Sequence, residues 1–296
     1  MEQQAWDIRL VALDLDGTLF TDQKTITPRT LAALTAALGQ GVEVVPATGR
    51  PAAGLPATLL ALPGLRYALT SNGARVWDLA QNAPVAEFLM QKPQAEAALR
   101  VLEGYDCVTD LFIEGRRISI ASQLTRMERI ISPAMLAYMR ATRTEVEDIY
   151  GYLAASPALP EKVSVVFAGD AQRAEAWRRL ESLGLGLVLS SSLDKNLEIN
   201  APGVTKGKGL CALARHLGLA KHQLMACGDS GNDLAMLEAA GLAVAMGNAE
   251  PGIRAAAAYV TATNEEDGVA KAVERFVLGR QAPCLAKRQA SKPAVR

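Results

Sequence analysis

Residues 8–18 read Ile-Arg-Leu-Val-Ala-Leu-Asp-Leu-Asp-Gly-Thr, a short apolar run followed by a turn. The run from Ile8 to Leu13 favours a buried strand, and Asp16-Gly17 is typical of the loop after it. Asp14 and Asp16 therefore stand at the carboxyl end of a strand, where open α/β sheets bind ligands. Because alternate residues of an extended chain point to the same side, both carboxylates can face one pocket. An Asx-type turn is the alternative explanation of this pair.

Strand and helix patterns alternate on both sides of the middle of the chain, which predicts a parallel sheet with crossover helices. In the N-terminal part we expect a helix from Pro28 to Gly39–Gly41, a strand over Val42–Ala47, a helix over Pro51–Leu62 and a strand ending at Ala68–Thr70. In the C-terminal part we expect helices over Lys208–Leu217, Asp233–Ala240 and Gly268–Leu278, and strands over Leu224–Cys227 and Leu242–Ala245.

The middle of the chain has a different pattern, which predicts an inserted α+β domain. The expected elements are a hairpin over Leu111–Ala121 that turns at Glu114-Gly115, helical turns near Pro133–Ala141, a strand over Lys162–Ala168, a helix over Ala171–Leu183 and a strand over Gly186–Leu189. We place the inserted domain at residues 84–199 and the parallel α/β domain at residues 1–83 and 200–279. Residues 280–296 carry five basic residues and no acidic one, which is typical of a solvated, disordered terminus.

Composition limits the classes of function. The chain has 296 residues, and its 31 basic and 31 acidic side chains give a formal net charge of zero. A nucleic-acid-binding protein usually has a basic surplus, so we expect no nucleic-acid partner. No apolar run is long enough to span a membrane, and we expect no secretory signal. Four cysteines without a CxxC pair fit reduced thiols, so we expect a cytoplasmic protein. The sequence does not indicate an oligomeric state.

A second acidic cluster, Gly228-Asp229-Ser230-Gly231-Asn232-Asp233, also lies between a predicted strand and a predicted helix. Its carboxylate and amide oxygens are the kind of ligand that Mg²⁺ prefers. We expect Asp229 to be a metal ligand and Asp233 to support it. Capping of the following helix by Ser230 or Asn232 is an alternative that is compatible with this role.

Two further sites could hold a phosphate group. Thr48-Gly49-Arg50 follows a predicted strand, where a hydroxyl and free backbone N–H groups make a phosphate subsite; taken alone, the tripeptide fits a helix N-cap better. Lys206 lies among glycines at a predicted helix start and could reach a phosphate as a point charge. Taken alone, Lys206 fits a solvated surface lysine equally well.

Taken together, these four pieces resemble, in order and spacing, the four motifs of the haloacid dehalogenase (HAD) superfamily. Four further segments are similar to the Cof-type branch with a class IIB cap: Asn72-Gly73-Ala74, Leu197-Glu198-Ile199, Val204-Thr205-Lys206-Gly207 and Asp267-Gly268-Val269. The resemblance covers the chain to about Gly279, and in the inserted domain only the layout matches. It implies an α/β fold, with a Rossmann-like parallel-sheet core and an inserted α+β cap that closes over the site.

The resemblance also implies a Mg²⁺-dependent phosphatase for a small phosphorylated metabolite, with sugar phosphates favoured. Asp14 would be the nucleophile that forms an aspartyl phosphate, and Asp16 the general acid and base. Mg²⁺ would be held by Asp14, the Asp16 backbone carbonyl and Asp229, supported by Asp233. The residues expected to bind the phosphate are Leu15 (through its backbone N–H), Thr48, Gly49, Lys206 and Asn232.

Two other functions stay open at this point. A sugar phosphomutase is the first, because sugar phosphomutases share the class IIB cap. A non-catalytic binding protein on the same scaffold is the second, although the intact set of motif residues speaks against it. Within the inserted domain, Arg116, Arg117 and Lys162 are candidates for a second anionic contact, but solvent exposure is the expected state of each.

Overall fold

The computed structural model describes residues 6–127, 140–191 and 195–280. The first sheet is parallel, and β1 lies between β12 and β2 within it. Its strands, in spatial order, are β14 (Tyr259–Val260), β13 (Leu242–Ala245), β12 (Leu224–Gly228), β1 (Leu10–Leu13) and β2 (Glu43–Pro46). All four residues of β1 are buried, as expected for a strand covered on both faces. The parallel α/β architecture predicted from the alternating pattern is confirmed.

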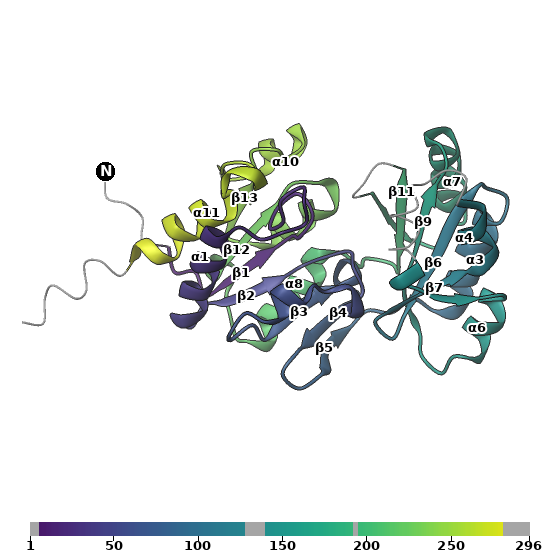
Figure 1. Cartoon of the computed structure of the whole chain (residues 1–296), viewed down its shortest axis with the longest axis horizontal. Coiled ribbons are helices and arrows are strands. Elements are labelled where there is room, and N and C mark those ends of the chain that lie inside the picture. The colour runs from purple at the N-terminus through teal and green to yellow at the C-terminus, as the bar shows by residue number, and fades with distance from the viewer. Residues whose placement is uncertain (1–5, 128–139, 192–194, 281–296) are drawn as a thin grey trace, which may run out of the picture.

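Helices cover this sheet (Figure 1). They are α1 (Pro28–Gly39), α2 (Ala57–Leu60), α8 (Lys206–His216), α9 (Leu234–Ala239), α10 (Pro251–Ala256) and α11 (Gly268–Phe276). Helix α1 begins where expected, because the Thr27 side chain accepts a hydrogen bond from the Thr30 backbone N–H and Pro28 occupies the first turn. The buried apolar side chains of α1, α8 and α11 join those of the sheet in one hydrophobic core.

Two predictions for the N-terminal part need correction. The single helix expected over residues 51–62 is instead a 3₁₀ turn at Ala52–Gly54 followed by α2, because Pro56 lacks an N–H and disfavours a helical conformation in the residue before it. The third strand, β3 (Tyr67–Thr70), meets β2 only through one parallel bridge between Ala47 and Leu69. Its full ladder is antiparallel, in a separate sheet with β4 (Arg75–Asp78) and β5 (Ala83–Glu87).

The inserted domain is a six-stranded sheet with helices packed on it. In spatial order the strands are β10 (Val188–Ser190), β11 (Asn196–Asn200), β9 (Pro160–Phe167), β6 (Cys107–Ile113), β7 (Arg116–Ile120) and β8 (Thr144–Val146). The helices are α3 (Lys92–Leu102), α4 (Ala121–Met127), α6 (Ile149–Ala155) and α7 (Asp170–Ser182). The predicted hairpin is confirmed as β6 and β7, and its turn uses positive φ angles at Glu114 and Gly115.

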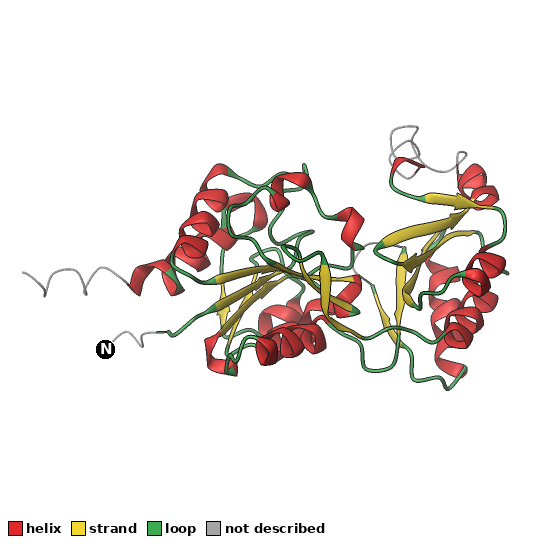
Figure 2. Cartoon of the chain, turned by 90° about the horizontal axis from the view of Figure 1, so that it is seen from below, coloured by secondary structure: helices red, strands yellow, loops and turns green. Residues whose placement is uncertain are grey.

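The two faces of this second sheet differ in chemistry. Alternate residues such as Leu111, Val163 and Leu197 form a second hydrophobic core with the helices. The intervening residues, which include Phe112, Lys162 and Glu198, belong to the opposite face by their register. In Figures 1 and 2 the helices of the inserted domain lie on the side of this sheet away from the parallel sheet. The mixed polar face is therefore turned toward the core domain.

Buried polar contacts join the two domains. The Glu161 carboxylate of the inserted domain accepts a hydrogen bond from the Ser71 hydroxyl of the core domain and forms an ion pair with Arg75 at 3.2 Å. Within the inserted domain it also accepts the Gly115 backbone N–H at 2.7 Å. Strand β5 pairs with β4, and β11 pairs within the second sheet. We therefore propose that the chain crosses between domains after Glu87 and after Asn200, close to the boundaries expected from the sequence.

Two of the predicted segments lie largely outside the described residues, namely the helical turns near residues 133–141, apart from 140 and 141, and the basic tail from residue 281 onward. Short 3₁₀ turns complete the described chain at Ser71–Gly73, Lys221–Gln223, Gly231–Asp233, Asn264–Glu266 and Leu278–Arg280. Within the described ranges, every helix is too short or too polar to cross a membrane.

Candidate active site

Loops at the carboxyl ends of adjacent strands bring the predicted residues to one edge of the parallel sheet. Asp14 follows β1 and donates its backbone N–H to the Cys227 carbonyl of β12 at 3.1 Å. Thr48 follows β2, and Asp229 follows β12. The carboxyl ends of parallel strands lie at the same edge, so residues far apart in sequence meet there.

Lys206, at the first turn of α8, connects two of the acidic residues. Its Nζ lies 2.5 Å from Asp14 Oδ1 and 2.7 Å from Asp233 Oδ1. Lys206 is only 1% exposed and Asp233 is fully buried. The interpretation of Lys206 as a solvated surface lysine is therefore wrong, and the lysine is part of the acidic cluster.

Asp229 and Asp233 are positioned by backbone and hydroxyl donors. Asp233 Oδ2 accepts hydrogen bonds from the backbone N–H groups of Asp229 and Ser230, at 3.0 and 3.1 Å. The Thr18 hydroxyl donates to Asp229 Oδ1 at 2.6 Å, a contact that sequence reasoning missed. Gly17 has a φ of +85°, and a Cβ on it would lie 2.5 Å from Asp229 Oδ2. The turn therefore requires glycine both for its backbone conformation and for the approach of Asp229.

The cluster carries more negative than positive charge. Burial raises the pKa of Asp14 well above its ordinary value, and the carboxylates of Asp233 and Asp229 add to this increase against the opposing charge of Lys206. Burial also raises the pKa of Asp229 to about 6. Burial alone would lower the pKa of Lys206, but Asp14 and Asp233 outweigh it and raise that pKa. Three carboxylates thus share one ammonium group.

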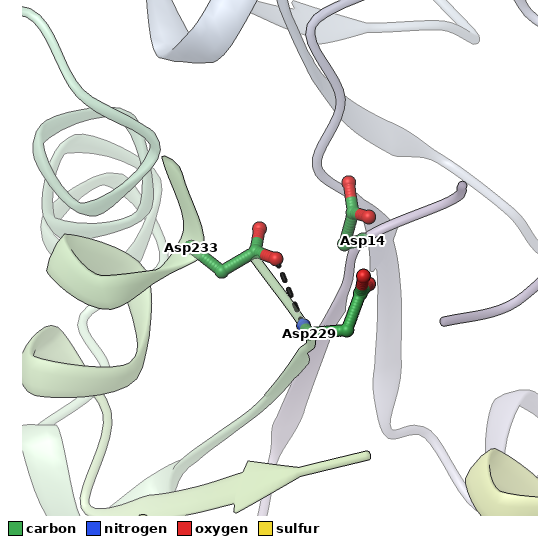
Figure 3. Close-up of side chains that lie close together, drawn as sticks. All are labelled: Asp14, Asp229 and Asp233. Carbon is green, nitrogen blue, oxygen red and sulfur yellow. Dashed lines mark hydrogen bonds between the residues drawn. The ribbon is translucent and has the colours of Figure 1, made fainter. Parts of the chain in front are cut away.

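The donor set fits a divalent cation. Oxygens of Asp14, Asp229 and Asp233 all lie within 4.8 Å of one another, and Figure 3 shows these three side chains gathered at one place. An all-oxygen, partly buried set with surplus negative charge suits Mg²⁺. Both oxygens of Asp233 already accept hydrogen bonds within the protein, and its supporting role at a metal stays a prediction.

Asp16 is not part of this carboxylate group, because its side chain is held by two cations. Arg50 donates from Nε to Oδ2 at 3.0 Å and from Nη2 to Oδ1 at 2.8 Å, and Lys24 Nζ lies 2.9 Å from Oδ1. Burial alone would raise the pKa of Asp16, but Arg50 and Lys24 outweigh burial and lower it. Sequence reasoning named neither cation as a partner; Arg50 directly after Thr48-Gly49 was the available signal.

The other expected phosphate-binding residues line the same edge. The Thr48 hydroxyl accepts the Arg50 backbone N–H at 3.1 Å. The next helical turn begins only at Ala52, after Pro51, so the interpretation of Thr48 as a helix N-cap is wrong. Leu15 has a fully buried side chain, which leaves only its backbone for a ligand. A Cβ on Gly49 would lie 2.8 Å from Glu198 Oε1 of the inserted domain. Asn232 Oδ1 accepts the Ser230 hydroxyl at 2.9 Å. Their roles toward phosphate stay predictions.

In the inserted domain, Lys162 is fully buried, contrary to the expected solvent exposure. Its ammonium group pairs with the Glu198 carboxylate and lies 4.6 Å from the centre of the Phe112 ring. Glu198 also accepts a hydrogen bond from Asn72 Nδ2 of the core domain at 3.0 Å. Sequence reasoning missed this burial because the partner of Lys162, Glu198, lies 36 residues away in the chain.

Comparisons with known proteins agree with this geometry. A family model of haloacid dehalogenase-like hydrolases matches residues 11–273. The chain is 31% identical over 278 residues to the 5-amino-6-(5-phospho-D-ribitylamino)uracil phosphatase YcsE of Bacillus subtilis, covering 94% of this chain and 99% of that one. It is 27% identical to the pyridoxal phosphate phosphatase YbhA of Escherichia coli, covering 89% and 96%.

The fold has a counterpart among solved structures. The HAD subclass IIB sugar phosphatase BT4131 superposes with a TM-score of 0.75 at 24% identity, over 90% of this chain and 98% of that one. This likeness supports the core-and-cap layout of the resemblance. With a family model matched over most of its length, the chain belongs to the haloacid dehalogenase-like hydrolase family and is a phosphoric monoester hydrolase.

Proposed function

We propose that the protein is a Mg²⁺-dependent phosphatase of small phosphorylated metabolites, and that it acts through an aspartyl phosphate on Asp14. The observation that carries this proposal is the contact of Lys206 with both Asp14 and Asp233, at 2.5 and 2.7 Å, within a partly buried group of three carboxylates. Such a site can neutralise a phosphoryl group while it presents a carboxylate nucleophile, and phosphoryl transfer depends chiefly on these two features.

In the first step, an Asp14 oxygen forms a bond to phosphorus and the bond from phosphorus to the ester oxygen breaks. The electron pair of that bond stays on the leaving oxygen, which takes a proton from Asp16. Lys206, Thr48, Asn232 and the backbone N–H groups after Asp14 hold the phosphoryl oxygens during this transfer.

In the second step, a water molecule attacks the phosphorus of the aspartyl phosphate. Asp16 takes a proton from this water, and the bond between phosphorus and Asp14 breaks to release inorganic phosphate and free Asp14. The cations beside Asp16 favour its ionised form, which is the form that accepts this proton.

Asp14, Asp229 and the Asp16 backbone carbonyl would hold the metal, with Asp233 in support. When bound, Mg²⁺ supplies positive charge that keeps the carboxylates ionised and offsets the charge of the phosphoryl oxygens. The surplus of carboxylates over ammonium groups in the cluster supports this need for a cation.

For the substrate class we propose phosphate esters of sugars or of similar polyhydroxylated metabolites. YcsE, a relative at 31% identity, is named for a substrate that carries a phosphoribityl chain. On the face of the inserted sheet that is turned toward the core domain, Ser164 is partly exposed and could form a hydrogen bond with such a chain.

A panel assay tests the proposal. Phosphate release is measured from sugar phosphates, ribitol 5-phosphate, nucleotides and pyridoxal phosphate, with Mg²⁺ and with EDTA, for the wild type and Asp14→Asn. We expect release from the sugar and ribitol esters that needs Mg²⁺ and is lost in the variant. Release that persists in Asp14→Asn would contradict the mechanism. Interconversion of sugar monophosphate isomers that needs a sugar bisphosphate, without release of inorganic phosphate, would favour the phosphomutase.

A further inference from the structure

Asn248, in the loop after β13, uses both ends of its side-chain amide. Its Nδ2 donates to the Gly17 carbonyl at 2.8 Å, and its Oδ1 accepts the Asn264 backbone N–H at 3.1 Å. These partners fix the orientation of the amide, because a carbonyl needs a donor and an N–H group needs an acceptor. Asn248 therefore ties the turn at Gly17 to the loop that contains Asn264.

The anchor behind Asn248 is itself firmly held. Asn264 is only 8% exposed, and its Nδ2 donates to the Phe20 carbonyl and to Asp22 Oδ1, both at 3.1 Å. The loop after β1 is thus attached at two places, at Gly17 through Asn248 and further along through Asn264. A side chain braced in this way can hold the Gly17 carbonyl in a fixed position.

The loop that carries Asn248 is also attached to the second acidic segment. The Met246 backbone N–H donates to the Gly228 carbonyl at 3.1 Å, and the Glu250 backbone N–H donates to the Asp229 carbonyl at 3.0 Å. Asn248 lies between these two attachment points in the chain. Its amide is therefore held in a fixed position relative to Asp229.

The turn at Gly17 is a contact between the two acidic segments. A Cβ on Gly17 would lie 2.5 Å from Asp229 Oδ2, and the Thr18 hydroxyl donates to Asp229 Oδ1 at 2.6 Å. The carbonyl that Asn248 holds belongs to the peptide bond between Gly17 and Thr18. Because groups behind a metal ligand fix its direction, the hold on this carbonyl affects how the turn meets Asp229.

We propose that Asn248 is a positioning residue of the Mg²⁺ site, which keeps the turn after Asp14 against Asp229 at a separation that one cation can bridge. This role rests on the proposed function, in which Asp14 and Asp229 hold Mg²⁺. Loss of a group that orients metal ligands typically weakens metal binding by about 10- to 100-fold. Asn248 is exposed, so water competes for its amide, and we expect an effect at the lower end of this range.

The test measures binding of Mg²⁺ alone, without substrate, by isothermal titration calorimetry. We expect Asn248→Ala to raise the dissociation constant of Mg²⁺ about tenfold. The Mg²⁺ concentration that gives half-maximal phosphatase activity should rise with it, and excess Mg²⁺ should restore most of the activity that is lost at limiting Mg²⁺. If Asn248→Ala does not fold by circular dichroism, Asn248→Gln replaces it and should weaken Mg²⁺ binding by a smaller factor.

Asn248→Asp separates the hold on Gly17 from simple charge effects. A carboxylate oxygen cannot donate to the Gly17 carbonyl, but its negative charge would by itself favour a nearby cation. We expect Asn248→Asp to bind Mg²⁺ more weakly than the wild type does. Equal or tighter binding would overturn the proposal.

Gln223→Ala is the matched control. The Gln223 amide also joins two segments of the core domain, because it accepts the Ala220 backbone N–H and donates to Asp7 Oδ2, both at 3.0 Å. Gln223 directly precedes β12, at the edge of the sheet opposite to the acidic cluster. The control should therefore leave the dissociation constant of Mg²⁺ unchanged.

Two outcomes separate this proposal from the proposed function. Wild-type Mg²⁺ affinity in the Asn248 variants, or an equal loss in Gln223→Ala, would overturn the role of Asn248 while the metal site stands. No binding of Mg²⁺ by the wild type would overturn the metal site as well.

Discussion

Lys206 and Lys162 are both buried lysines paired with carboxylates, yet their surroundings differ in charge. Lys206 belongs to a core cluster, Asp14, Lys206, Asp229 and Asp233, in which three acids share one ammonium group. Lys162 belongs to an interface cluster, Lys162, Glu198 and Asn72, in which one acid meets one ammonium group and a neutral amide. The imbalance gives the core cluster a surplus of negative charge that a cation could offset, whereas the two charges of the interface cluster balance each other.

The comparison teaches that burial of a lysine does not by itself mark a catalytic site. Lys162 is as deeply buried as Lys206, and its partner Glu198 reaches across to Asn72 of the core domain. A balanced pair of this kind helps to hold the two domains in register. The following predictions test whether the core cluster acts in catalysis while the interface cluster acts in stability.

The largest effect is expected for Asp14→Asn in the core cluster. Loss of the nucleophile should lower phosphatase activity on the order of 10³-fold or more. Because one of the crowded carboxylates becomes neutral, the unfolding midpoint in EDTA should stay the same or rise. Activity assays and urea unfolding measure the two effects, with Asp106→Asn, an exposed acid of the inserted domain, as the control. A large loss of stability in Asp14→Asn would contradict the interpretation that the core cluster carries surplus negative charge.

Lys162→Met should act mainly on stability. It leaves the Glu198 carboxylate buried without its cation, which typically costs about 3–5 kcal/mol in the free energy of unfolding. Urea unfolding monitors this loss, and Lys162→Met combined with Glu198→Met should recover much of it. If the single variant is stable but loses hydrolysis of p-nitrophenyl phosphate, the interface cluster belongs to the chemistry and the distinction between the clusters fails.

Gly49→Ala tests the contact between the loop that follows β2 and the interface cluster. The new Cβ would lie 2.8 Å from Glu198 Oε1 and 3.1 Å from Asn72 Oδ1, so the interface must shift. We expect a loss of about 1–3 kcal/mol in stability and a higher KM, because the loop with Thr48 also moves. Gly39→Ala in α1, with no atom within 4 Å of its Cβ, is the control and should not destabilise. Unchanged KM and stability would show that the Gly49 loop is not tightly packed against Glu198 and Asn72.

The smallest effect is a difference in pH dependence, measured as unfolding free energy in EDTA. Asp229 has a raised pKa, so the folded state keeps a proton between the ordinary value of 3.8 and about 6. Its contribution is therefore fully present below pH 3.8 and lost as the pH rises through about 6. Glu198 has a lowered pKa because the charge of Lys162 outweighs burial. Its contribution is present above the ordinary value of 4.5 and lost in acid.

The slopes of the unfolding free energy against pH that Asp229 and Glu198 cause have opposite signs. Each reaches at most about 1.4 kcal/mol per pH unit. Asp229→Asn should remove the loss on the alkaline side, and Glu198→Gln should remove the loss on the acidic side. Added Mg²⁺ should flatten only the slope that depends on Asp229. The same sign of slope for both groups would mean that the two clusters do not differ in charge balance.

Several features followed from the sequence alone. The apolar run before Asp14 predicted β1, because a strand buried on both faces tolerates few polar residues. The alternation of strands and helices predicted the parallel sheet, whose carboxyl edge had to collect Asp14, Thr48 and Asp229. These are local patterns, and the rule that places ligands at that edge depends only on strand direction. Pro56 gave a local signal as well, although the single helix predicted there was wrong.

The tertiary structure alone decided which charges meet. Solvent exposure was one interpretation of both Lys206 and Lys162, but Lys206 lies among three carboxylates and Lys162 pairs with a single one, 36 residues away. The Asp16–Arg50 fork joins residues 34 positions apart from two different strand ends. Charge balance in a buried site depends on distances between chain segments, and no local pattern contains those distances. The sequence was thus sufficient to predict which residue types gather at the carboxyl edge of the sheet. The tertiary structure was needed to know which charges lie next to one another there.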